Sequence, residues 1–128
     1  MSTQVIQILI AGALFVHGIG HTLGYFMPAR SWLFPNLPAP TMRVAANVVW
    51  TLAAIGFVLS TLSFLGIVLP SDLWRQLAVA FAIVSLLGLG VFWGTWPIFN
   101  AIGALAMNIV ILVTQLWIDW PPIEMFGH

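Results

Sequence analysis

The chain has 128 residues, of which 62% are hydrophobic and 5% are charged, and its formal net charge is zero. Soluble domains carry about 25% charged residues, so this composition excludes an ordinary soluble domain and indicates an integral membrane protein. Lysine is absent and the three arginines form no cluster, which argues against nucleic acid as a partner. The absence of cysteine excludes disulfides, thiolate metal sites and thiol nucleophiles.

The first apolar segment, about residues 4–27, exceeds the roughly 20 residues that a helix needs to cross a bilayer. No basic residue precedes its apolar run, unlike in a secretory signal peptide, so we expect a retained membrane helix. Four prolines in residues 28–41 prevent a regular helix there and predict an interfacial loop. This loop is either a plain connector, with its aromatic side chains at the lipid headgroups, or a lid over the helix ends.

Three further apolar segments follow, and each has the length of a membrane helix. Thr41 is a candidate N-cap for the second, and Pro70 and Pro97 mark the two tight turns. Short turns require antiparallel neighbours, so the predicted fold is all-α: a single domain over residues 1–128, folded as a four-helix up-and-down membrane bundle. The predicted helices cover residues 4–27, 42–66, 73–93 and 96–118.

The arginines suggest an orientation. Arg30 and Arg43 flank the first loop, whereas Arg75 lies at the opposite end of the bundle. The positive-inside rule then places loop 28–41 in the cytoplasm and both termini outside, in a bacterial-type cytoplasmic membrane.

Two histidines lie four residues apart inside the first apolar segment. Helical spacing places His17, His21 and Tyr25 in one column, because residues four apart lie on the same face. Ionisable side chains within a membrane helix are costly and usually face a protein interior, a cavity or a cofactor. This column is therefore the main candidate site.

Polar side chains of three helices lie at similar depths. Counted from the loop 28–41 end at about 1.5 Å per residue, they fall between about 6 and 18 Å into the helices. Such groups need hydrogen-bond partners in hydrocarbon, so we expect them to face one another, either as a ligand pocket or as a network that only pairs the helices. The predicted pocket is lined by His17, His21, Tyr25, Asn47, Trp50, Thr51, Asn100 and Asn108.

Three kinds of cofactor suit this pocket. Neutral imidazoles four apart can share a divalent metal, so His17 and His21 are candidate metal ligands. One histidine could serve as an axial ligand of haem, and His, Tyr and Asn side chains could hydrogen-bond a quinone packed against tryptophan. No catalytic residue is assigned, because the metal-binding spacing lacks the glutamate of hydrolytic zinc sites. We therefore favour a binding protein over an enzyme.

The predicted function is binding of a small hydrophobic or redox ligand: a quinone, haem or a lipid-like molecule. Two alternatives remain open. The chain could be an accessory or structural subunit of a larger membrane complex, or a small oligomeric transporter whose histidines handle protons. The lipid bilayer is the expected surrounding in each case, with a homo-oligomer or a larger complex as the partner.

Overall fold

The computed structural model describes residues 1–122, which form four long helices and no strand. Helix α1 (Thr3–Gly20) continues into η1 (His21–Phe26), a segment of tighter 3₁₀ geometry. Helix α2 spans Ala39–Phe64, and α3 (Trp74–Val91) follows the short turn η2 (Ser71–Leu73). Helix α4 (Ile98–Val113) ends in η3 (Thr114–Ile118), a turn of wider π-helical geometry.

Four continuous helical stretches are long and apolar enough to cross a membrane: Thr3–Phe26, Ala39–Phe64, Ser71–Val91 and Ile98–Ile118. The predicted all-α bundle of four membrane helices is thereby confirmed. Each helix hydrogen-bonds its own backbone, which is the condition for crossing hydrocarbon without unpaired peptide groups.

Two helix starts differ from the sequence prediction. Helix α2 begins at Ala39 rather than after Thr41, because Pro40 fits within the first helical turn, where no backbone N–H donor is required. Helix α4 begins at Ile98, directly after Pro97. Thr95 donates its hydroxyl to the carbonyl of Phe92 at 2.8 Å, so it closes the end of α3 rather than opening α4.

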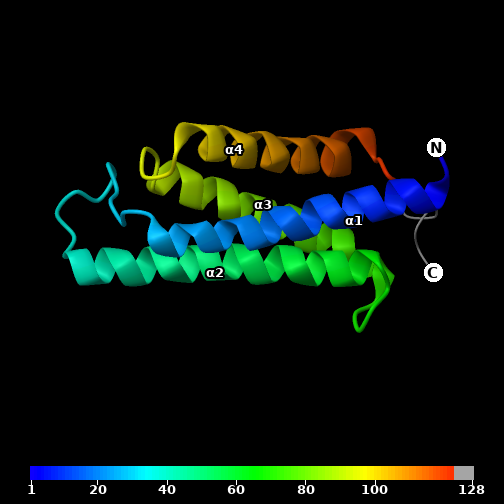
Figure 1. Cartoon of the computed structure of the whole chain (residues 1–128), viewed down its shortest axis with the longest axis horizontal. Helices are drawn as coiled ribbons and strands as arrows, with labels where there is room; N and C mark the ends of the chain where they lie inside the picture. Colours follow the sequence, from blue (N-terminus) through cyan, green and yellow to red (C-terminus); the bar gives the residue numbers. More distant parts are fainter. Residues whose placement is uncertain (123–128) are drawn as a thin grey trace.

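Helices adjacent in the chain pack along one another, with α2 in extensive contact with both α1 and α3. Figure 1 shows α2 along one side of the bundle and α4 along the other, above α3. Helix α4 packs mainly on α3 and meets α1 much less. The bundle is therefore tight on the α1/α2/α3 side and loosely closed between α1 and α4.

Two apolar clusters fill the interior, one toward each end of the helices. The first contains Phe57 and Phe64 of α2, Trp74 of α3 and Ile111 of α4. The second is built around Trp50, which is 1% exposed. Buried polar side chains lie between the two clusters and form the candidate site.

The loop after η1 is tied to the end of α3. The hydroxyl of Ser31 donates to the carbonyl of Val91 at 2.6 Å, and the indole N–H of Trp32 donates to that of Gly90 at 2.7 Å. The guanidinium of Arg43 donates to the carbonyl of Met27 at 2.6 Å. These bonds hold the loop against α3 and the start of α2.

The glycines fall into two groups. At Gly18, an added Cβ would lie 2.8 Å from the Cβ of Phe57 and 3.2 Å from the Ala54 carbonyl, so only glycine allows this approach of α1 to α2. At Gly24 an added Cβ would overlap the Trp50 indole. At Gly12 it would meet no atom within 4 Å. Glycine is thus a packing requirement at some positions and not at others.

We expect Gly18→Ala to lower the free energy of unfolding by about 1–3 kcal/mol, because the methyl group would force the α1 and α2 backbones apart. The matched control is Gly12→Ala in the same helix, where the methyl group meets open space. Reversible unfolding in detergent, followed by circular dichroism, measures both. Equal stability of the two variants would contradict the close packing described at Gly18.

Candidate functional site

Four polar side chains form a closed hydrogen-bond cycle between the two apolar clusters: His17, His21, Ser85 and Asn108. His17 Nε2 lies 2.7 Å from Asn108 Oδ1, and Asn108 Nδ2 lies 2.7 Å from Ser85 Oγ. Ser85 Oγ lies 2.6 Å from His21 Nε2, and His21 Nδ1 lies 2.7 Å from the backbone carbonyl oxygen of His17. The cycle therefore connects α1, η1, α3 and α4.

The protons of the cycle can be assigned from its acceptors. The carbonyl of His17 only accepts, so His21 Nδ1 carries the proton, and Nε2 of a neutral His21 accepts from the Ser85 hydroxyl. The Ser85 oxygen then accepts from the Asn108 amide, whose oxygen accepts from His17 Nε2–H. This assignment satisfies all four bonds with both imidazoles neutral.

The opposite orientation of the Asn108 amide cannot form all four hydrogen bonds with both imidazoles neutral. With the amide oxygen toward Ser85, the serine hydroxyl would donate to Asn108, and His21 Nε2 would have to donate to Ser85. His21 would then carry protons on both nitrogens and a positive charge inside an apolar bundle, where charge is costly. The neutral assignment also leaves His17 Nδ1 as a lone-pair acceptor.

Aromatic side chains surround the two imidazoles. The Phe57 ring stacks on His21 with a centroid separation of 5.6 Å, and it also lies 4.6 Å from the His17 ring. Trp50 lies 6.0 Å from His21 on the side of the second cluster. Asn108 and Ser85 are fully buried, and His21 is 2% exposed. Water and lipid are thus excluded from most of the cycle.

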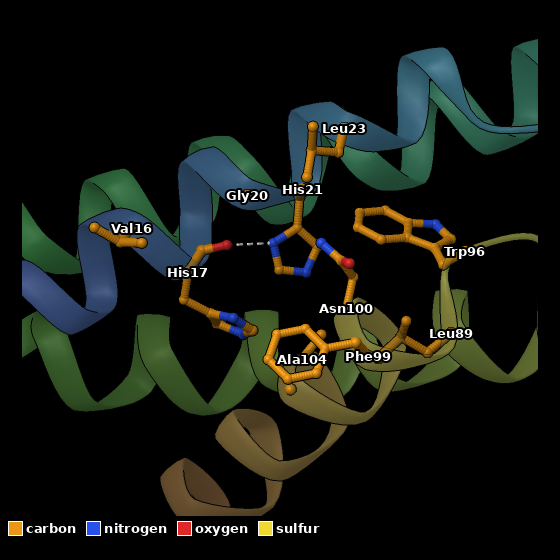
Figure 2. A pocket seen from close by; sticks show the side chains of 11 residues that line it. Val16, His17, Gly20, His21, Leu23, Leu89, Trp96, Phe99, Asn100 and Ala104 are labelled. Atoms are coloured by element: carbon orange, nitrogen blue, oxygen red, sulfur yellow. Dashed lines mark hydrogen bonds between the residues drawn. The ribbon is translucent and has the colours of Figure 1, made fainter.

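A cavity of about 190 Å³ adjoins the cycle between α1 and α4, and we call it the α1/α4 cavity (Figure 2). Its polar lining comes from His17, His21 and Asn100. Figure 2 shows the Asn100 side chain extending from α4 toward the side on which His21 lies. The other lining residues are Val16, Gly20, Leu23, Leu89, Trp96, Phe99, Gly103 and Ala104, and of these only Trp96 has a polar side-chain atom, its indole Nε1. No formal charge faces this space.

Three side chains that line the cavity have polar atoms without a partner in the described part of the chain: His17 at Nδ1, Asn100 at its amide and Trp96 at its buried Nε1. Figure 2 shows the indole nitrogen of Trp96 on the side of its ring away from His21, so we consider His17 Nδ1 and the Asn100 amide as the groups for a ligand. Both nitrogens of His21, in contrast, are occupied by the cycle. The cavity therefore offers one imidazole acceptor and one amide that both donates and accepts.

Two of the residues that line the cavity are glycines, whose lack of a side chain leaves space in it. Gly20 of α1 and Gly103 of α4 both line it, and an added Cβ at either would meet no atom within 4 Å. Helix packing does not require glycine at these positions, unlike at Gly18. Their missing side chains leave space beside the two unused polar groups.

The remaining predicted site residues lie elsewhere. Tyr25 hydrogen-bonds Thr51 in a separate groove between η1 and α2, because the 3₁₀ turn of η1 rotates Tyr25 off the histidine face. Asn47 lines a depression on α2 together with Thr51, and its buried Oδ1 has no partner in the described part of the chain. Trp50 supports His21 from within the second cluster. Of the predicted set, only His17, His21 and Asn100 line the α1/α4 cavity.

The hydrogen bonds of the two histidines limit which ring nitrogens could bind a metal or haem iron. A metal shared by His17 and His21 would have to displace a hydrogen bond of His21. Among residues 1–122, no three His, Asp or Glu side chains gather at one point. His17 Nδ1 is the imidazole lone pair that the hydrogen-bond cycle leaves unused.

Ser85 belongs to the cycle but was missing from the sequence prediction. It is the sole hydroxyl residue of α3, and it lies about as deep from the loop 28–41 end as His21. The depth comparison that selected the asparagines would have selected Ser85 as well. A small hydroxyl side chain is easily taken for a helix-packing residue in a membrane segment.

Comparison of the chain with protein-family models, with curated proteins and with solved structures gave no match in any of the three. Any function must therefore be argued from the site itself.

We expect a double-mutant cycle of His17→Ala and Asn108→Ala to give a coupling energy of about 0.6 kcal/mol, and at most about 1.7 kcal/mol, the range of hydrogen bonds in membrane proteins. The control cycle pairs His17→Ala with Asn100→Ala and should give a coupling near zero, because these side chains share no bond. Unfolding in detergent supplies the four stabilities of each cycle. Equal coupling in the two cycles would argue against the bond between His17 and Asn108.

Proposed function

We propose that this protein binds a small hydrophobic ligand within the membrane and holds the ligand's polar end in the α1/α4 cavity. One observation carries the proposal: a cavity with apolar walls contains two polar groups, on His17 and Asn100, that the fold leaves unpaired. Unpaired polar groups facing hydrocarbon are unfavourable, and a ligand with a matching polar end would satisfy them. Apolar walls with a few placed polar groups are typical of small-molecule sites.

The size of the cavity limits the ligand. Sites for whole drug-sized molecules start at about 300 Å³. The α1/α4 cavity measures about 190 Å³ and is open on one side, so it suits the head of a ligand whose remainder lies outside. A quinone or a lipid-like molecule meets this description better than haem, whose whole macrocycle would have to enter.

A second space lies beyond the α1/α4 cavity, farther along the same two helices toward the opposite end of the bundle. It measures about 270 Å³, lies between the same two helices, and is lined by apolar residues such as Ala13 of α1 and Val110 of α4. The bond between His17 and Asn108 crosses from α1 to α4 between the two spaces. A hydrocarbon chain attached to the bound head would lie along this groove.

The alternative function is that of a structural or accessory subunit. It is favoured by the cycle itself, which satisfies both nitrogens of His21, the Ser85 hydroxyl and the Asn108 oxygen without a ligand. In that case the histidines would only set the pairing of the helices. The unused Nδ1 of His17 and the open positions at Gly20 and Gly103 favour the binding function instead.

The test fills the cavity without disturbing the packing. Gly20→Leu and Gly103→Leu should each place a side chain in the cavity, whereas Gly12→Leu places the same side chain in open space outside it. We expect native mass spectrometry of gently extracted protein to show an added mass on the unmodified chain and on Gly12→Leu. Both cavity variants should lose it while keeping their thermal stability.

Two results would count against the proposal. The same added mass on all four proteins would place the ligand outside the α1/α4 cavity. If none of the four proteins carried a small-molecule mass and other subunits were bound to the chain instead, the accessory role would be favoured.

A further inference from the structure

We infer that the polar end of the ligand is an uncharged hydroxyl group, which donates its hydrogen bond to Nδ1 of His17. This inference rests on the proposed function and specifies the class of ligand. It follows from the protons of the hydrogen-bond cycle, which determine what each cavity atom can accept or donate.

The first step concerns His17. Its Nε2 carries the proton that is donated to Asn108, so Nδ1 of the neutral imidazole is an acceptor and cannot donate. The tautomer is held by the rest of the cycle, because Asn108 is oriented by Ser85 and Ser85 by His21. A ligand group that meets Nδ1 must therefore bring its own proton.

The second step concerns charge. The cavity is lined by His17, His21, Asn100 and the indole of Trp96, and by no arginine, aspartate or glutamate. A phosphate or carboxylate head would lack a cationic partner, and an ammonium head would lack an anionic one. The ligand's polar end is thus neutral.

The third step separates hydroxyl from carbonyl ligands. A ligand with carbonyl oxygens alone would place an acceptor against the acceptor at His17 Nδ1 and would leave that nitrogen without a donor. A hydroxyl can donate to Nδ1 and at the same time accept from Asn100.

A hydroxyl on a hydrophobic body occurs in two kinds of molecule: aliphatic alcohols and the reduced, quinol form of a quinone. Binding of two matched pairs to the purified full-length chain in detergent tests the inference. One pair is 1-dodecanol and its methyl ether; the other is a decyl-substituted benzoquinol, kept reduced, and the corresponding quinone. The members of each pair differ at the group that can donate a proton.

We expect the hydroxyl member of a pair to bind about two- to tenfold more tightly, the range that one net hydrogen bond contributes. His17→Ala should abolish this preference. Asn100→Ala should weaken binding but retain the preference, because His17 Nδ1 remains. A preference in the alcohol pair, or in the quinol pair, identifies which kind of molecule supplies the hydroxyl.

The affinities of the two members of each pair are compared on the unmodified chain, so this part of the test does not depend on the folding of any variant. Equal binding within both pairs, tighter binding of the ether or the quinone, or a preference that survives His17→Ala would each overturn the inference. The proposed function stands separately if the native added mass is still lost in Gly20→Leu. If no probe binds and no native mass is found, both proposals fail.

Discussion

The bundle depends on a single constraint: polar side chains buried between apolar helices have to find partners within the protein, because hydrocarbon supplies none. The hydrogen-bond cycle of His17, His21, Ser85 and Asn108 meets this constraint with four bonds. A shift of one turn in α1, α3 or α4 would break the cycle. The cycle therefore sets their register together with close contacts such as that of Gly18 with Phe57.

The attachment of α4 accounts for the candidate site. Helix α4 packs along α3 and meets α1 much less, and the bond between Asn108 and His17 joins α4 to α1. A polar side-chain bridge holds two helices farther apart than small residues in direct contact would, and it leaves space on either side. His17 therefore belongs to both the scaffold and the candidate site: its Nε2 joins α1 to α4, and its side chain also lines the cavity.

The sequence predicted the fold well and the site in part. Apolar length and proline positions located the four helices, and matched depth along the helices indicated that polar side chains of different helices meet, as His17 and Asn108 do. Depth does not, however, give direction around a helix axis. Thr51 and Asn47 lie at a suitable height but face away from the cavity, on α2. Tyr25 left the histidine column because η1 adopts 3₁₀ geometry, which a four-residue spacing cannot reveal.

The cycle also has a consequence for how the chain is made. His21 and its partner Ser85 are separated by 64 residues, and His17 and Asn108 by 91. Helix α1 is synthesised first, so His21 can meet Ser85 only after α3 has been made, and His17 can meet Asn108 only after α4 has been made. Until α4 is in place, His17 Nε2 lacks the hydrogen-bond partner that the folded bundle supplies. Addition of α4 is thus the step that completes the cycle.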